Sequence, residues 1–316
     1  MNLIERLERW FSQLFTRFKP KKFCDDVKPA PNPRWVSMVN VSWFGAYGHG
    51  EGTHLLGYPA EIDWEEIEAD FQKCNENFVQ VVRAFIFENL DGLTKIGTVW
   101  DIQPEALVSL QRLKQLLIKY QLRLEAVLFE FKNDEAQPYL PDFLKVTPMR
   151  MVVGAFIRQM HEVLWAIDLH NEIDYLHLVR QVPLAKLNEA IAGYRAVIKV
   201  MAPALPYTCS TGWKGGYWAR RGQIGVEALD FIEVHHYGHN HGEPWERRNP
   251  MSLCGLENLG KPVLLGEFKS DDFSEYATRC RERGFLGAAP WSIHHDFPIS
   301  AATWQLIRDS RIEAIT

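Results

Sequence analysis

Short apolar segments alternate with segments of helical periodicity eight times along this chain, and that alternation limits the folds open to it. A continuous apolar run bounded by turns is typical of a strand covered on both faces, as in a parallel sheet. Eight such strands, each followed by a helix or a helix-sized segment, predict an α/β fold, a single (β/α)8 barrel. The 316 residues allow it, because such barrels commonly need about 250 residues. The expected strands cover residues 36–43, 78–87, 123–131, 163–172, 207–211, 231–237, 263–268 and 285–291.

Several of the expected helices carry a recognisable start signal. Asp63 stands before an amphipathic segment and can cap its first turn. Pro104 is typical of the first position of the next helix. Thr147, followed by Pro148, is expected to cap the helix that leads into 163–172. A helix over 303–315 should close the chain.

Residues 1–33 are expected to lie outside the barrel, which would then cover 34–316. Residues 1–22 place apolar side chains at helical spacing and are rich in Arg and Lys, and residues 28–33 form a Pro-rich linker. Charges interrupt the apolar run, so it is neither a secretory signal peptide nor a membrane span. Two interpretations remain: an amphipathic helix docked on an anionic membrane or a protein partner, and a helix packed on the outside of the barrel.

Composition excludes some partners and favours others. A net charge of −5 and the lack of a basic stripe give no reason to expect a nucleic-acid partner. Five cysteines without a CxxC pair favour reduced thiols in a cytoplasmic protein. Eleven Trp and ten Tyr suit a protein that stacks against flat ligands such as sugars, although aromatic rings are also ordinary core material.

Polar side chains stand at the C-terminal ends of the expected strands, the edge where barrel enzymes carry their active sites. Strand 163–172 ends in four residues that look too polar for the core, namely Asp168, His170, Asn171 and Glu172. Glu267 repeats this arrangement on 263–268. Burying an isolated carboxylate is costly, so strands that end this way usually open into a cleft. The two edges predict a pair of acids that face each other. The remaining polar or aromatic strand-end residues are Arg83, His235, His236, Tyr237 and Trp291.

This set resembles the catalytic residues of clan A glycoside hydrolases, most closely family 5, the cellulase and mannanase family. The resemblance covers the chain from about residue 35 and depends on the order and strand placement of the residues. It implies that Glu172, preceded by Asn171, is the acid/base and that Glu267 is the nucleophile. Ile173 stands where the family usually has Pro, and Glu130 stands where it often has His. The second difference leaves the sugar open.

The chemistry assigns each residue an expected role. Glycosidic cleavage needs one carboxylic acid to protonate the leaving oxygen and one carboxylate to meet the oxocarbenium-like centre. Burial and the charge across the cleft should raise the pKa of Glu172. Arg83 should keep Glu267 ionised, and a carboxyl separation of about 5–5.5 Å would give retention of configuration. The other expected contacts are Tyr237 to Glu267, Asn171 to the sugar 2-hydroxyl, His235 to Glu172 or a sugar hydroxyl, Trp291 under the −1 sugar, and Trp43 at a further subsite.

Structural alternatives remain for these residues. Arg83 could form an ion pair with Glu88, Glu125 or Glu130, and the tryptophans could be core. Clustered His235, His236, His239 and His241 could bind a metal, but strand 36–43 lacks the His-x-His of metal-dependent barrel hydrolases. No cofactor is expected. Besides a retaining glycosidase on a β-linked glucan, mannan or related glycan, two functions stay open: a silent glycan-binding or scaffold barrel, and a metal-dependent hydrolase.

Overall fold

The computed structural model describes residues 35–41, 59–60, 62–131, 134, 136–212, 224–237, 256–293 and 298–313. Eight parallel strands form a nearly closed barrel in the order β7-β6-β5-β2-β1-β10-β9-β8, which confirms the predicted (β/α)8 fold. All eight lie within or within a residue of the predicted ranges. They are β1 (Val36–Asn40), β2 (Val81–Glu88), β5 (Arg123–Glu130), β6 (Leu164–His170), β7 (Tyr207–Thr208), β8 (Ile232–His235), β9 (Val263–Glu267) and β10 (Gly287–Ala288).

The barrel closes between the segment after β7 and β8. Thr211 forms a parallel bridge with Val234. The Thr211 N–H donates to the Glu233 carbonyl (3.2 Å), and the His235 N–H donates to the Thr211 carbonyl (2.8 Å). This seam brings two short segments together, and both carry residues of the site described below.

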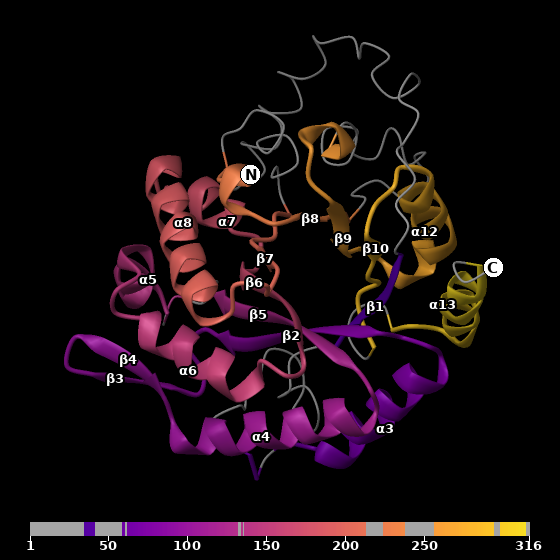
Figure 1. Ribbon diagram of the computed structural model, residues 1–316, viewed down its shortest axis with the longest axis horizontal. Helices are drawn as coiled ribbons and strands as arrows, with labels where there is room; N and C mark the ends of the chain where they lie inside the picture. Colours follow the sequence, from indigo (N-terminus) through magenta and orange to yellow (C-terminus); the bar gives the residue numbers. More distant parts are fainter. Residues whose placement is uncertain are drawn as a thin grey trace, which may run out of the picture.

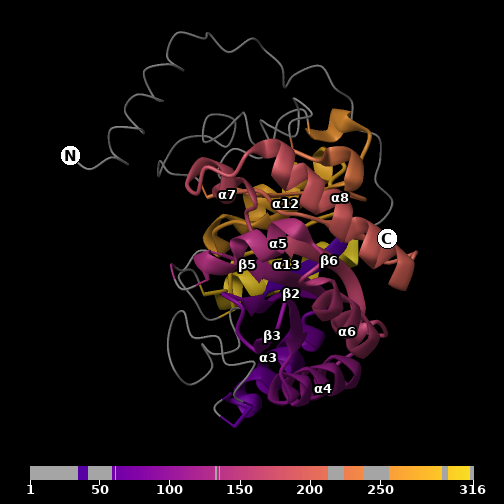
Figure 2. The same ribbon diagram turned by 90° about the vertical axis from the view of Figure 1, so that its left-hand side faces the viewer.

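Helices surround the strands (Figures 1 and 2). In Figure 1, α3 and α4 run along the lower side, α8 lies on the left, and α12 and α13 lie on the right. No described helix is both long enough and apolar enough to cross a membrane. The helices are α3 (Trp64–Glu76), α4 (Pro104–Lys119), α5 (Leu140–Lys145), α6 (Arg150–Met160), α7 (Asp174–Leu178), α8 (Leu184–Met201), α12 (Phe273–Glu282) and α13 (Ala301–Glu313), with 3-10 turns at η1 (Gln137–Tyr139), η2 (Val226–Ala228), η3 (Leu256–Leu259) and η4 (Ser270–Asp272).

Two of the three predicted helix starts are confirmed. The Asp63 carboxylate accepts hydrogen bonds from the backbone N–H groups of Glu65 (3.1 Å) and Glu66 (3.0 Å). Helix α4 begins at Pro104. The Thr147 cap was wrong, because α6 begins at Arg150 and its N-cap position has no side-chain hydrogen bond. The chain turns through 147–149 instead, and the Pro148 carbonyl accepts from the Trp100 N–H (2.8 Å).

That Trp100 belongs to an antiparallel hairpin that the sequence did not reveal. Strands β3 (Leu93–Ile96) and β4 (Val99–Ile102) pair between β2 and α4. The Trp100 indole N–H donates to the Asp142 carboxylate (3.0 Å) and so ties the hairpin to α5. Each strand has four residues, which is too short for a clear alternation of polar and apolar positions.

The barrel interior is built in layers, because side chains two residues apart on a strand share a face. On β2, Val81 lies in an apolar floor and Phe85 lies in an upper apolar cluster. Arg83 stands between them and carries the charged layer described below. The floor consists of Met38, Val81, Ala166, Phe231, Leu264 and Ala289, and the upper cluster consists of Phe85, Val127 and Trp291 with Tyr237 packed against it.

Some sequence predictions lie outside the described residues. They include the helix and linker of 1–33, the domain start at residue 34, Trp43, His239 and His241. These stay predictions.

We expect Asp63→Ala to lower the free energy of unfolding by about 1 kcal/mol, because two N–H groups of α3 lose their acceptor. Asp63→Asn keeps an acceptor oxygen and should cost less. Urea denaturation of the two variants checks this. Equal losses would show that the cap hydrogen bonds are not the cause.

Candidate active site

Arg83 is buried and forms ion pairs with three carboxylates from three other strands. Its Nη1 lies 2.6 Å from Glu267 Oε1, its Nη2 lies 2.9 Å from Asp168 Oδ2, and its Nε lies 2.8 Å from Glu233 Oε1. Burial by itself would lower the pKa of Arg83, but these carboxylates raise it well above its usual value. The guanidinium is therefore a permanent cation inside the barrel. The ion pairs with Glu88 and Glu130 considered above are not formed.

Two amides are oriented by the same guanidinium. Asn40 Oδ1 accepts from Arg83 Nη1 (3.2 Å), while its Nδ2 donates to the carbonyls of Gly266 (2.8 Å) and Ala289 (3.0 Å). Asn171 Oδ1 accepts from Arg83 Nη2 (3.0 Å), and its Nδ2 donates to Glu130 Oε1 (2.6 Å). Glu130 thus fixes the direction in which Asn171 presents its amide.

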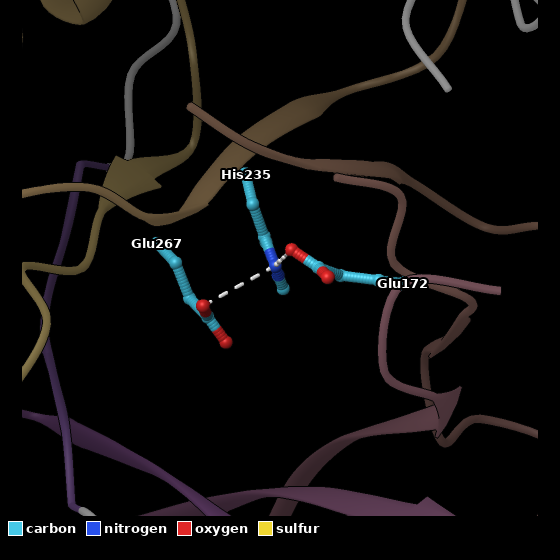
Figure 3. A group of neighbouring side chains, drawn as sticks. All are labelled: Glu172, His235 and Glu267. Atoms are coloured by element: carbon cyan, nitrogen blue, oxygen red, sulfur yellow. Dashed lines mark hydrogen bonds and ion pairs between the residues drawn. The ribbon is translucent and has the colours of Figure 1, made fainter. Parts of the chain in front are cut away.

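The carboxyl groups of Glu172 and Glu267 lie on either side of the His235 imidazole (Figure 3). His235 Nδ1 is 3.2 Å from Glu172 Oε1 and 3.4 Å from Glu267 Oε2. These nitrogen and oxygen atoms lie within 4.8 Å of one another. The Tyr237 hydroxyl donates to Glu267 Oε2 (2.8 Å). The two predicted acids therefore face each other at the C-terminal edge of the barrel.

His235 is a buried cation at neutral pH. Burial lowers its pKa, but the charge of Glu267 and the hydrogen bonds to Glu172 and Glu233 outweigh that effect and raise the pKa to about 10. Among the described residues, Glu172, His235 and Glu267 are the group with atoms close enough to hold a metal ion. A metal ligand needs the lone pair of a neutral imidazole. A metal ion would thus compete with a firmly held proton.

Glu172 has an unusual backbone that aims its side chain. Its φ is +46°, a left-handed conformation that costs a non-glycine residue roughly 1–3 kcal/mol. The Glu172 N–H donates to Ser210 Oγ (3.1 Å), and the next N–H, of Ile173, donates to the Ser210 carbonyl (3.0 Å). A Cβ atom at Gly212 would lie 2.8 Å from Glu172 Cγ and closer still to its carboxyl group. Gly212 thus leaves the space that this side chain occupies.

Gly266 plays the same part for Glu233. A Cβ atom at Gly266 would lie 2.8 Å from Glu233 Cγ and Cδ and closer to Oε1. The Gly-Glu sequence that ends β9 therefore leaves room for one carboxylate at Gly266 and presents another at Glu267.

Carboxylates below the mouth share the field of Arg83. Burial and the charge of Glu233 raise the pKa of Asp168 to about 6, against the pull of Arg83 and Ser210. Burial and Glu233 raise the pKa of Glu125 well above its usual value. Burial would raise the pKa of Glu233 too, but Arg83 and His235 hold it below its usual value.

The structure places the other predicted residues as follows. Trp291 is buried at the barrel mouth with its ring edge-on to Phe85 (5.8 Å between centroids). The His236 ring lies against Tyr276 of α12 (5.6 Å), whereas His235 and Tyr237 point to Glu267. Asp168 and His170 were expected outside the core, yet both are fully buried. His170 stacks on Phe131 (5.9 Å), which accommodates its ring among aromatic side chains.

The predicted site residues gather in one place, with Trp43 outside the described residues. Sequence reasoning assigned no role to Asp168 or Glu233 and weighed Glu125 only as an ion-pair partner of Arg83. The sequence does hold a signal for Glu125, Asp168 and Glu233. Each is a charged residue within a largely apolar strand, as Arg83 is. The residues missed were Asn40, Glu125, Asp168, Ser210 and Glu233.

The fold is that of known glycosidase structures. A β-1,4-mannanase from the sea hare Aplysia kurodai matches with a TM-score of 0.61 and 16% identity over 88% of this chain and 91% of that one. A β-1,4-D-mannanase from Cryptopygus antarcticus matches with 0.64 and 15% over 88% and 90%. A GH5_18 protein from Bifidobacterium longum subsp. longum, in complex with Manβ1-4GlcNAc, matches with 0.61 and 14% over 87% and 78%. These likenesses support the family 5 resemblance at the level of the fold.

No family model matches the chain. No curated protein sequence matches it either.

Gly266→Ala should destabilise the protein by about 1–3 kcal/mol, because the new methyl group collides with the buried Glu233 side chain. Gly154→Ala is the matched control. In α6, its Cβ would meet only the end of Arg158, at 3.6 Å. It should be stabilising by roughly 0.5–1 kcal/mol, since Ala is the better helix former. Chemical denaturation of both variants decides, and a neutral Gly266→Ala would contradict the tight packing.

His235 should make stability depend on alkaline pH. Its pKa rises from about 6.5 in the unfolded chain to about 10 in the folded protein. The stabilisation from its charge is complete below the unfolded pKa and is lost as pH rises through the folded one. The free energy of unfolding should therefore fall between pH 7 and 10 less steeply in His235→Asn than in the wild type. His161→Asn, at an exposed site, should keep the wild-type slope. Parallel slopes for His235→Asn would contradict the charge assignment.

Proposed function

We propose that this protein is a retaining glycoside hydrolase that cleaves a β-glycosidic bond by double displacement. The observation that carries the proposal is the pair of carboxyl groups, Glu172 and Glu267, whose nearest oxygens lie within 4.8 Å at the C-terminal edge of a (β/α)8 barrel. Retaining enzymes keep their two carboxyl groups about 5–5.5 Å apart, because one of them must reach the anomeric carbon itself. An inverting enzyme needs a wider gap that admits a water molecule.

In the first step, Glu267 attacks the anomeric carbon and the bond from that carbon to the leaving oxygen breaks. Glu172 gives its proton to the leaving oxygen, so the departing group leaves as a neutral alcohol. The product is a glycosyl ester of Glu267. Arg83 (2.6 Å) and the Tyr237 hydroxyl (2.8 Å) hold the attacking carboxylate in place.

In the second step, a water molecule attacks the anomeric carbon from the side that the leaving group vacated, and Glu172 takes a proton from that water molecule. The ester bond to Glu267 breaks, and the carboxylate returns to its ion pair with Arg83. Two inversions give net retention of configuration. Glu172 is thus acid in one step and base in the next, and no cofactor enters either step.

The surrounding residues suit a sugar between these acids. The Asn171 amide, oriented by Arg83 and Glu130, has a second N–H for a sugar 2-hydroxyl, a contact that strengthens in the transition state. Trp291 at the mouth offers an aromatic surface to the −1 sugar. The mannan-active enzymes of similar fold make β-mannosides the first substrates to test, with β-glucosides second. Residues 1–22 as a docking helix, and a cytoplasmic location, remain predictions.

Turnover on aryl β-mannosides and β-glucosides tests the roles of the two acids. Glu267→Gln should abolish turnover. Glu172→Ala should lose roughly 10²–10⁴-fold on substrates with poor leaving groups and less on activated aryl glycosides, which need no proton. Glu189→Gln, an exposed change on α8, is the control. A barrel that only binds glycans would show no turnover in the wild type, and a metal-dependent hydrolase would lose activity on chelation.

Trapping with a 2-deoxy-2-fluoro β-mannoside or β-glucoside tests the covalent step. The fluorine slows both steps by destabilising the positive charge at the anomeric carbon, so the ester accumulates. Peptide mass spectrometry should find the sugar on Glu267. A label on another residue, or hydrolysis with inversion by NMR, would overturn the mechanism.

A further inference from the structure

Glu233 lies beneath the two acids and contacts both cations of the site. Its Oε1 is 2.8 Å from Arg83 Nε and 3.6 Å from His235 Nε2. Each cation in turn contacts Glu267, Arg83 through Nη1 (2.6 Å) and His235 through Nδ1 (3.4 Å). Glu233 is therefore connected to Glu267, the carboxylate that would attack the sugar, through Arg83 and, separately, through His235.

The carboxylate of Glu233 has little freedom to move. Its side chain is fully buried, and Gly266 is the residue that leaves space for it, as described above. Residues Glu233 and His235 have the same parity on β8, so one carboxylate anchors the imidazole that follows it on the same face. The geometry fixes the direction of His235 Nδ1 toward the mouth.

Glu125 supplies a second carboxyl group to the same buried layer. It lies on β5 in register with Arg83 and is fully buried, and neither of its carboxyl oxygens has a hydrogen-bond partner among the described residues. A buried carboxylate that has neither a cation nor a hydrogen-bond donor beside it is costly, so such a group takes up a proton. Glu233 has Arg83 and His235 as partners, whereas no described cation lies within ion-pair distance of Glu125. The proton therefore belongs on Glu125.

We propose that Glu233 is a positioning residue that holds Arg83 and His235 as cations against the reacting carboxylates, and that a proton on Glu125 keeps the Glu125–Glu233 pair at a single negative charge. The inference rests on the proposed glycosidase function for its catalytic consequence, but the location of the proton does not depend on it.

A proton on Glu125 limits the excess of negative charge in the layer. The groups facing His235 and Glu233 are Arg83 from β2, Glu125 from β5, Asp168 and Glu172 from β6 and its end, Tyr237 after β8, and Glu267 from β9. With Glu125 protonated, two cations meet the three carboxylates Asp168, Glu233 and Glu267. An ionised Glu125 would add a fourth carboxylate without a cation of its own, a costly state in a buried layer.

The matched variants Glu125→Gln and Glu233→Gln separate this from ordinary packing. A Gln at 125 is neutral and has nearly the same shape as the protonated acid. A Gln at 233 removes the negative charge that faces both cations. The two substitutions are alike in size and burial, so a merely structural role predicts similar effects.

The direct readout is the titration of His235 by NMR in uniformly ¹⁵N-His-labelled protein, assigned with His235→Asn. Glu233→Gln should lower the pKa of His235 by roughly one to three units, since an opposite charge at this distance has that effect. Glu125→Gln should leave it close to the wild type. Equal shifts in both variants, or no shift in Glu233→Gln, would overturn the proposal.

Infrared spectroscopy covers the case in which Glu233→Gln fails to fold. The wild type should show the C=O band of protonated carboxylic acids at neutral pH, and Glu125→Gln should lose the part of that band that Glu125 contributes. Retention of the whole band in Glu125→Gln would refute the assignment of the proton.

The catalytic consequence is read from kcat/KM against pH. The alkaline limb reports the essential acid, Glu172, which His235 contacts. In Glu233→Gln this limb should move to higher pH, because His235 loses its charge more readily and a cation beside Glu172 is lost. In Glu125→Gln the limb should stay in place. If no glycoside is turned over by the wild type, the proposed function fails while the NMR and infrared results still decide on the proton. If turnover is found and the limb of Glu233→Gln coincides with that of the wild type, the positioning role fails alone.

Discussion

A single guanidinium holds the centre of this barrel together. Arg83 is fully buried and is the partner of Glu267, Asp168 and Glu233, which come from three different strands. Removing one partner of a buried ion pair is much more damaging than the pair is stabilising, because it leaves a charge without compensation. Here one removal would strand three carboxylates. The orientations of Asn40 and Asn171 depend on the same group.

The barrel makes such a group tolerable by placing it between two apolar layers. The floor below it excludes water, and the aromatic cluster above it borders the mouth. Charges in this slab interact more strongly than they would in water, because little solvent screens them. His235 illustrates the result: a side chain that usually titrates near neutrality is held as a cation by the carboxylates around it. The same surroundings hold the Glu267 carboxyl group in contact with two donors, Arg83 and Tyr237.

The sequence predicted the number, order and approximate place of the strands, because long apolar runs and strand-end polar residues are strong local signals. It also predicted which strand ends meet. It did not predict Glu233 or Asp168 as partners of Arg83, because a strand alone does not say which of its polar residues meet across a closed barrel. The prediction of the Thr147 cap was wrong for a related reason. The Pro148 carbonyl accepts a hydrogen bond from the β3–β4 hairpin, and the helix begins at Arg150 instead. The N-terminal helix and Trp43 lie outside the described residues, so those predictions are neither confirmed nor wrong.

The seam between β7 and β8 has a consequence for how rigid this arrangement is. Strand β7 has two residues, and an isolated bridge between Thr211 and Val234 connects the segment after it to β8. By contrast, β2 and β5 have eight residues each and pair with each other along their length. Ser210 and Gly212, which support Glu172, lie on one side of this seam, and Glu233 and His235 lie on the other. Opening of the seam would therefore change the distance between the carboxyl groups of Glu172 and Glu267, while the ion pair of Glu267 with Arg83 stayed in place. This short seam among the described strands therefore coincides with the spacing on which the proposed double displacement depends.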